Sequence, residues 1–113
     1  MAEQDELVTD GGLTIHVHRT GQRFQLSLSG ELDLENSTTL DHWLEQAEAS
    51  DAAEIVLDLS QLAFIDSTGL KSILIAANRS QQDHNRLGVL RGTGQVARLL
   101  ELTAIDQSLT LLD

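Results

Sequence analysis

Four consecutive residues, Asp66-Ser67-Thr68-Gly69, place a carboxylate and two hydroxyls next to a glycine. An apolar stretch typical of a buried strand precedes them (EIVLDL, 54–59), and a stretch with helical spacing follows (LKSILIAANRS, 70–80). The start of a helix leaves backbone N–H groups unpaired and carries about half a positive charge, so it favours side-chain oxygens and anions. These residues are therefore the first place to look for chemistry.

Two interpretations of this turn are compatible. In the first, Asp66 or Ser67 is the N-cap of the helix and Gly69 allows close packing. In the second, a hydroxyl accepts a phosphoryl group, whose charge of about −1.5 to −2 the helix end tolerates. A serine that caps a helix is also an exposed serine, so both can hold at once.

Catalysis is not predicted. A nucleophilic Ser67 needs a base within hydrogen-bonding reach, and the four histidines fall on a strand face, on a helix and in a late loop (16, 18, 42 and 84). His16 and His18 share one strand face and could bind a metal ion, but no further ligand is evident, so a solvated face is favoured. We expect no cofactor and no metal.

Two motif matches are weak. Residues 92–97 read G-x-G-x-x-A after a strand and at the start of a helix, a formal dinucleotide-binding pattern, but this strand–helix–strand unit is the last in the chain and has no second half. A glycine-bearing turn capped by Thr93 is favoured instead. The segment IDSTG (65–69) has one residue more than the Asp-Thr-Gly of aspartic proteases, and it occurs once, in a strand-to-helix turn.

Charge argues against nucleic acid as a direct partner. The formal net charge is −11, and no Lys or Arg lies between Arg23 and Lys71. That interval holds ten acids, which are Glu31, Asp33, Glu35, Asp41, Glu45, Glu48, Asp51, Glu54, Asp58 and Asp66. Such a surface repels phosphates and anionic membranes.

The chain length of 113 residues favours a single domain with an aliphatic core. Without cysteine, disulfides and thiolate metal sites are excluded. The acidic start is unlike a secretory signal and no apolar run reaches 18 residues, so a soluble, cytoplasmic protein without membrane insertion is expected. Residues 1–11 are interpreted as a flexible acidic tail and residues 12–113 as the domain.

Alternating apolar positions predict a β-hairpin from residues 13–19 and 23–30, joined by the turn TGQ. Helical spacing follows within residues 31–50, where Asn36, Ser37 and Thr38 are possible N-caps. After the strand at 54–59 and the helix from 70, we expect a strand at 86–91, a helix at 93–102 and a closing strand at 108–113. The order β-β-α-β-α-β-α-β predicts one α/β domain with a mixed five-stranded sheet and three to four helices, its crossovers right-handed.

The segment IVLDLSQLAFIDSTGLKSIL (55–74) resembles the central signature of the STAS family, the sulphate-transporter and anti-sigma-factor-antagonist domains. LSLSGELDLENSTTL (26–40) resembles a second landmark, a strand ending in Gly-Glu-Leu-Asp, and GTGQVARLLELTAID (92–106) resembles the third helix of the family. The resemblance covers residues 13–113 in order, and points to the free-standing anti-sigma-factor antagonists.

The resemblance places Ser67 at the position that a partner kinase phosphorylates in the antagonists. Asp33 and Asp66 match acidic residues that border this serine, and Thr68 matches the neighbouring hydroxyl. Gly69 and Leu70 open the helix as in the family. Lys71 is a departure, because many antagonists have a small residue there.

The resemblance therefore implies a non-catalytic phosphoswitch. The unphosphorylated protein would bind an anti-sigma factor, a serine kinase of the GHKL type, and so release a sigma factor to regulate transcription. Phosphorylation of Ser67 would break the complex, and a serine phosphatase would reset it. The alternative within the family is an accessory subunit of a membrane ABC transporter for lipids or anions, which docks on the ATPase and needs no kinase.

Overall fold

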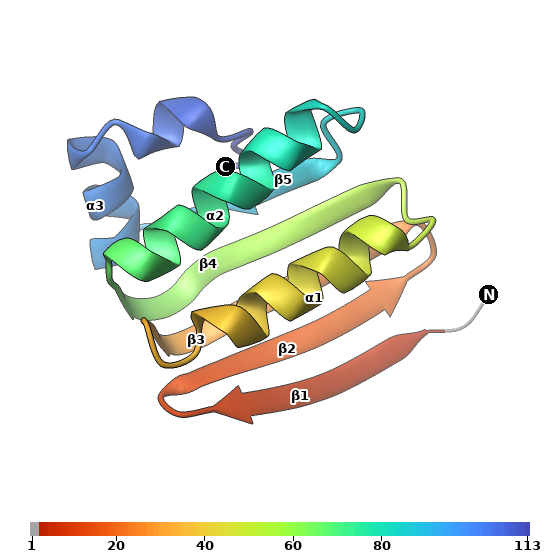
Figure 1. The fold of residues 1–113 in the computed structure, drawn as a ribbon, viewed down its shortest axis with the longest axis horizontal. Coiled ribbons are helices and arrows are strands. Elements are labelled where there is room, and N and C mark those ends of the chain that lie inside the picture. Colours follow the sequence, from red (N-terminus) through yellow and green to blue (C-terminus); the bar gives the residue numbers. More distant parts are fainter. Residues whose placement is uncertain (1–2) are drawn as a thin grey trace.

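A computed structural model describes residues 3–113. The elements in chain order are β1 (Gln4–Asp10), β2 (Leu13–Thr20), β3 (Arg23–Leu32), α1 (Ser37–Ala49), β4 (Glu54–Ile65), α2 (Ser67–Gln81), β5 (Leu87–Leu90), α3 (Gln95–Leu102) and the 3-10 helix η1 (Ile105–Ser108). The strands form one sheet in the order β1-β2-β3-β4-β5 (Figure 1). β2 runs antiparallel to both of its neighbours, β1 and β3, whereas β3–β4 and β4–β5 are parallel pairs. The predicted α/β class and mixed five-stranded sheet are confirmed.

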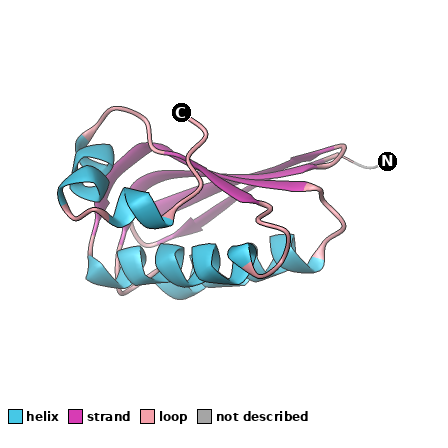
Figure 2. Cartoon of the chain, turned by 90° about the horizontal axis from the view of Figure 1, so that it is seen from above, coloured by secondary structure: helices cyan, strands magenta, loops and turns pink. Residues whose placement is uncertain are grey.

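Two long helices, α1 and α2, lie side by side over one face of the sheet, and α3 lies at one end of it (Figure 2). The core forms where these helices meet the sheet. The apolar sides predicted for the hairpin and for the helices are buried. Core residues from these elements include Leu13, Ile15, Val17, Phe24, Leu26, Leu28, Leu40, Leu44, Ala47 and Ile73. The alternating and helical patterns therefore identified the buried faces correctly.

The expected acidic tail is largely a strand. Met1 and Ala2 lie outside the described residues, but Gln4–Asp10 form β1, which pairs with β2 along its whole length. Gly11, with φ of +58°, makes the tight turn that joins the two strands. β1 lies at the sheet edge with most of its residues exposed, so its polar sequence carries no alternating signal, and backbone hydrogen bonds hold it instead.

The predicted closing strand at 108–113 is wrong in extent. Residues 105–108 wind into η1, so only one isolated parallel bridge remains, between Val89 and Leu111. The sheet still has five strands, because β1 replaces the lost one. The element order becomes β-β-β-α-β-α-β-α.

β4 is longer than the apolar run that predicted it, and it ends at Ile65, directly before the hydroxyl turn. α2 then packs closely on the sheet. A side chain at Gly69 would bring its Cβ within 2.8 Å of Leu32 and 2.9 Å of Ile65. The buried Gly69 therefore allows the close approach that the sequence predicted.

Candidate functional site

Ser67 is the first residue of α2, and its side chain is exposed at the end of the helix where backbone N–H groups are unpaired. The neighbouring Thr68 and Leu70 are partly buried, whereas Lys71 is exposed one turn further along the helix. Residues four apart lie on the same helix face, so Ser67 and Lys71 are neighbours on the surface of α2. Among residues 3–113, Lys71 forms no ion pair within 4 Å.

Asp66 is the N-cap of α2, as one of the two capping alternatives predicted. Its Oδ1 accepts a hydrogen bond from the N–H of Gly69 at 2.9 Å. Its Oδ2 accepts a second one from the N–H of Leu34 at 3.1 Å. Both carboxylate oxygens are therefore used, and this one side chain fastens the β3–α1 loop to the start of α2.

Asp33 lies in this loop and is partly buried. Its Oδ1 accepts a hydrogen bond from the backbone N–H of Glu35 at 3.0 Å. This bond keeps the Asp33 carboxylate in the loop. Asp33 directly precedes Leu34, so it lies one residue from the backbone N–H that bonds to Asp66.

Asn36 is a supporting residue whose type and position in the sequence predict only a possible cap. It is the N-cap of α1 by position, yet its side chain makes no capping bond. It is fully buried instead, accepting from the N–H of Asp33 at 2.9 Å and donating to the carbonyls of Glu31 at 3.0 Å and Asp10 at 3.3 Å. This buried amide holds the loop that carries Asp33 against the end of β1.

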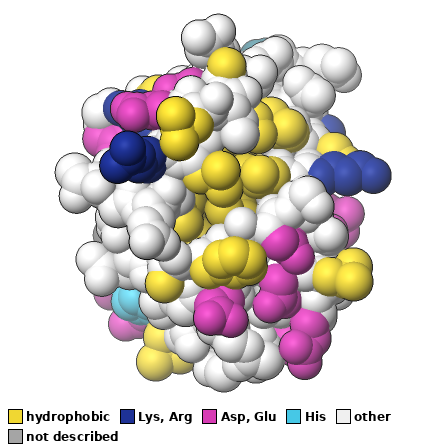
Figure 3. All heavy atoms as spheres, turned by 90° about the vertical axis from the view of Figure 1, so that its left-hand side faces the viewer, with side chains coloured by type: hydrophobic (Ala, Val, Ile, Leu, Met, Phe, Trp, Pro, Cys, Tyr) yellow, Lys and Arg dark blue, Asp and Glu magenta, His cyan; other side chains and the backbone are white. Residues whose placement is uncertain are grey.

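Two large apolar side chains are exposed on segments that adjoin this turn, Leu34 in the β3–α1 loop and Phe64 near the end of β4, and we call these two the apolar patch. Leu34 is 74% exposed and Phe64 is 50% exposed, and both are among the large hydrophobic side chains that the fold leaves at the surface. Phe64 borders a hollow between the end of β4 and α3, which is also lined by Ala63, Ile65, Gln95, Val96 and Leu99. Figure 3 shows hydrophobic side chains gathered in the middle of this face, with acidic side chains along one side of them.

The residues of the dinucleotide-like motif and the histidines lie away from Ser67. The glycines of the 92–97 motif lie at the turn into α3, where Asp113 accepts a hydrogen bond from the N–H of Gly92 at 2.8 Å. Burial alone would raise the pKa of the Asp113 carboxyl, but the bonds from Gly92 and Arg91 lower it overall. His16 and His18 bond to Asp5 and Thr20 rather than to Ser67.

Most of the chain matches a known domain family. Residues 15–113 match a family model described as "Mlab, STAS domain". The chain belongs to the STAS domain family. The resemblance inferred from the sequence is thereby confirmed.

Two relatives are anti-sigma factor antagonists. This STAS domain is 30% identical over 86 residues to the anti-sigma-F factor antagonist RsfB of Mycobacterium tuberculosis, which covers 76% of this chain and 70% of RsfB. It is 27% identical to an anti-sigma factor antagonist from Mycobacterium paratuberculosis, whose crystal structure superposes with a TM-score of 0.74 over 88% of this chain and 84% of that one. Within the family, the chain is therefore similar to anti-sigma factor antagonists.

A more distant structure shares the fold alone. The Bacillus cell fate determinant SpoIIAA, solved in its phosphorylated form, has a TM-score of 0.61 and 18% identity over 99% of this STAS domain and 92% of SpoIIAA. Within residues 3–113, none of the helices combines the length and the apolar character that crossing a bilayer requires.

Proposed function

We propose that this STAS domain is an anti-sigma factor antagonist that acts as a phosphoswitch at Ser67. The observation that carries the proposal is the exposure of Ser67 at the N-terminus of α2, next to the apolar patch. A kinase can reach an exposed hydroxyl, and a partner can cover the patch only if it also covers or borders Ser67. The relatives RsfB and the Mycobacterium paratuberculosis protein are antagonists, which supports the same role here.

The unmodified surface suits a protein partner. Leu34 and Phe64 offer apolar area, and burying such side chains contributes about 1.5–3 kcal/mol each. Glu31, Asp33 and Glu35 belong to the same stretch of chain as Leu34, and their carboxylates favour a partner with complementary cationic groups. The proposed partner is an anti-sigma factor that is also a serine kinase of the GHKL type.

Phosphorylation would change this surface through charge. A phosphate brings about −1.5 to −2 charges to a place already bordered by Asp33 and Asp66. The helix N-terminus and Lys71 would stabilise the phosphate within this chain, so the modified form is tolerated here. A partner adapted to a neutral hydroxyl would lose contacts and meet repulsion, and each tenfold loss of affinity needs only about 1.4 kcal/mol. A serine phosphatase would restore binding.

The test uses Ser67→Ala as bait for affinity capture, followed by mass spectrometry and binding measurements with the purified partner. We expect wild type and Ser67→Ala to bind a GHKL-type kinase, and Ser67→Asp to bind it at least tenfold more weakly. Ser108→Asp is the matched control, because it adds the same charge to an exposed serine near the opposite end of α2. Equal affinity of all these forms would refute the switch.

The same capture tests the second candidate from the sequence analysis, an accessory subunit of an ABC transporter. Recovery of a transporter ATPase, with binding that does not respond to Ser67→Asp, would replace the proposed function. Incubation of the captured kinase with wild type and ATP, followed by intact-mass analysis, then checks the modification directly. Transfer of one phosphate to wild type and none to Ser67→Ala is the expected result.

A further inference from the structure

Asp5, His16 and His18 gather on the sheet face opposite the helices α1 and α2. Asp5 comes from β1 and both histidines come from β2, two residues apart on one face of that strand. The ligand atoms of the three side chains all lie within 4.8 Å of one another. In the part of the chain that the structure describes, this is the one group of three such side chains.

We infer that these three side chains form a binding site for a divalent transition-metal ion, with Zn²⁺ as its best occupant. Two imidazole nitrogens and one carboxylate oxygen are a common zinc ligand set, and a water molecule completes the tetrahedron. Mg²⁺ and Ca²⁺ prefer oxygen ligands alone, so the two histidines discriminate against them. The inference is independent of the phosphoswitch at Ser67.

One of the two separations between imidazole and carboxylate is close to what such an ion needs, and the other has to lengthen to admit it. Bonds of about 2.0–2.2 Å place tetrahedral ligand atoms about 3.3–3.5 Å apart. His18 Nδ1 and Asp5 Oδ1 are 3.8 Å apart, and His16 Nε2 contacts the same carboxylate oxygen more closely. Small rotations of exposed side chains adjust both separations. The side chains of His16 and His18 are 45% and 43% exposed, so both rings border solvent. The Nδ1 atom of His18 is itself enclosed, so this ring has to turn to admit an ion.

The two nitrogens of His18 point to the same conclusion. Nδ1 is enclosed and, within residues 3–113, has no hydrogen-bond partner, although it lies 3.8 Å from Oδ1 of Asp5. Nε2 lies 2.8 Å from the hydroxyl of Thr20. If Nε2 carries the proton and donates it to Thr20, the lone pair of Nδ1 faces the carboxylate and is free for a metal. Metal-bound histidines commonly have this outer partner on their second nitrogen.

A bound ion would connect the edge strand to the rest of the sheet. β1 has one neighbouring strand and is mostly exposed, and its link to β2 at this position consists of backbone bonds and the contacts of Asp5. An ion held by Asp5 and both histidines adds a cross-strand link, and it stabilises the folded form because the unfolded chain lacks the assembled site.

The test is a Zn²⁺ titration of the untagged full-length chain against a chromophoric chelator. We expect one Zn²⁺ per chain, with affinity at least tenfold weaker in His16→Gln, His18→Gln and Asp5→Asn. Thr20→Val should weaken binding on the order of tenfold, because it removes the outer partner of His18. His42→Gln is the matched control, since His42 is an exposed histidine on α1. Circular dichroism in excess chelator establishes that each variant is folded.

A second readout places the ion in the structure. With Zn²⁺ present, the ring signals of His16 and His18 should shift in NMR spectra, and the amides of Gln4–Asp10 should exchange more slowly. Absence of stoichiometric Zn²⁺ binding would overturn the inference. An equal loss of affinity in His42→Gln and His16→Gln would overturn it as well.

Discussion

The Oδ2 atom of Asp66 accepts a hydrogen bond from the backbone N–H of Leu34 across 32 positions of the chain, at 3.1 Å. The other carboxylate oxygen caps α2 at Gly69. The loop that presents Leu34 and the helix that presents Ser67 therefore share one anchor. This shared anchor makes the surface around Ser67 a single unit rather than two independent loops.

Replacement of Asp66 should loosen both parts at once. Asp66→Ala removes an N-cap, which typically costs about 0.5–2 kcal/mol, and also leaves the Leu34 amide without its partner. Urea denaturation should show that loss, and hydrogen exchange should show faster exchange of the Leu34 amide. Asp66→Asn keeps one acceptor oxygen and should fall between wild type and Asp66→Ala. Unchanged exchange at Leu34 in Asp66→Ala would contradict the shared anchor.

The close approach of α2 to the sheet predicts a penalty for Gly69→Ala. The added methyl group would lie within 3.0 Å of Leu32 and Ile65 side-chain atoms, so it should destabilise the fold by about 1–3 kcal/mol. Gly94→Ala is the matched control, because in the described part of the chain no atom beyond its own neighbours lies within 4 Å of a Cβ at that glycine. Thermal denaturation of both variants measures the difference. Equal melting temperatures would show that the helix can shift without cost.

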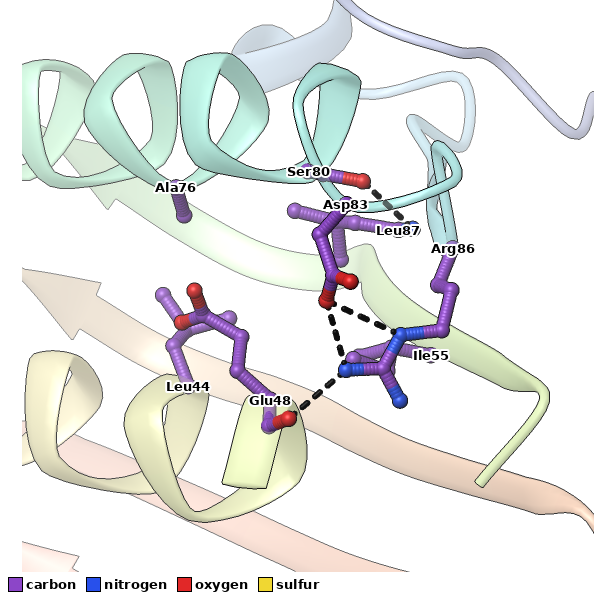
Figure 4. A pocket seen from close by; sticks show the side chains of 8 residues that line it. All are labelled: Leu44, Glu48, Ile55, Ala76, Ser80, Asp83, Arg86 and Leu87. Carbon is purple, nitrogen blue, oxygen red and sulfur yellow. Dashed lines mark hydrogen bonds and ion pairs between the residues drawn. The ribbon is translucent and has the colours of Figure 1, made fainter. Parts of the chain in front are cut away.

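Arg86 should be a major contributor to stability. Its guanidinium donates to the carbonyl of Glu48 at 2.6 Å and to Asp83 at 2.8 Å (Figure 4). It also donates to the carbonyl of Ala52 at 2.6 Å. Arg86→Met leaves carbonyls at the end of α1 without donors in a partly buried place, so we expect a loss of about 1–3 kcal/mol by urea denaturation. Arg23→Met, at a side chain that is 50% exposed, should cost well under 1 kcal/mol.

The docking role proposed for the apolar patch predicts separate effects on binding and folding. Leu34→Ser and Phe64→Ser should each weaken binding of the anti-sigma factor at least about tenfold, because each removes exposed apolar area from the proposed interface. Their melting temperatures should stay near that of wild type. Leu7→Ser is the control, as Leu7 is 71% exposed but lies on β1. Equal losses at Leu7 and Leu34 would argue against the patch.

The lowered pKa of Asp113 predicts a pH dependence of stability. The hydrogen bonds from Gly92 and Arg91 favour the charged form, so their contribution is complete above the usual pKa of 3.8 and is lost as the pH falls through the lower folded value. Asp113→Asn should therefore melt below wild type at pH 7. The gap between them should close as the pH falls below about 3.8. A constant gap over that range would contradict the assignment.

Local patterns were sufficient for much of this protein. Alternation identified β2, β3 and their buried sides, because adjacent strand residues face opposite sides of a sheet. The residue types at Asp66 and Gly69 predicted a cap and a close approach, and both are present. The resemblance carried by residues 55–74 identified the family before any fold was known.

Other features depended on contacts between distant parts of the chain. β1 has few apolar residues, and its order comes from backbone pairing with β2. Asn36 looked like a capping residue, but the fold buries it between Asp10 and Glu31.

The predicted closing strand is too long, because sequence spacing does not show that residues 105–108 wind into η1. Only Leu111, beyond η1, pairs with β5. Asp5 joins His16 and His18 only through the register of β1 against β2. Sequence alone determined the elements with a strong apolar period and the residue types of the site, because both are local properties. The tertiary structure decided which polar side chains meet, since pairing and burial join residues that the chain keeps far apart.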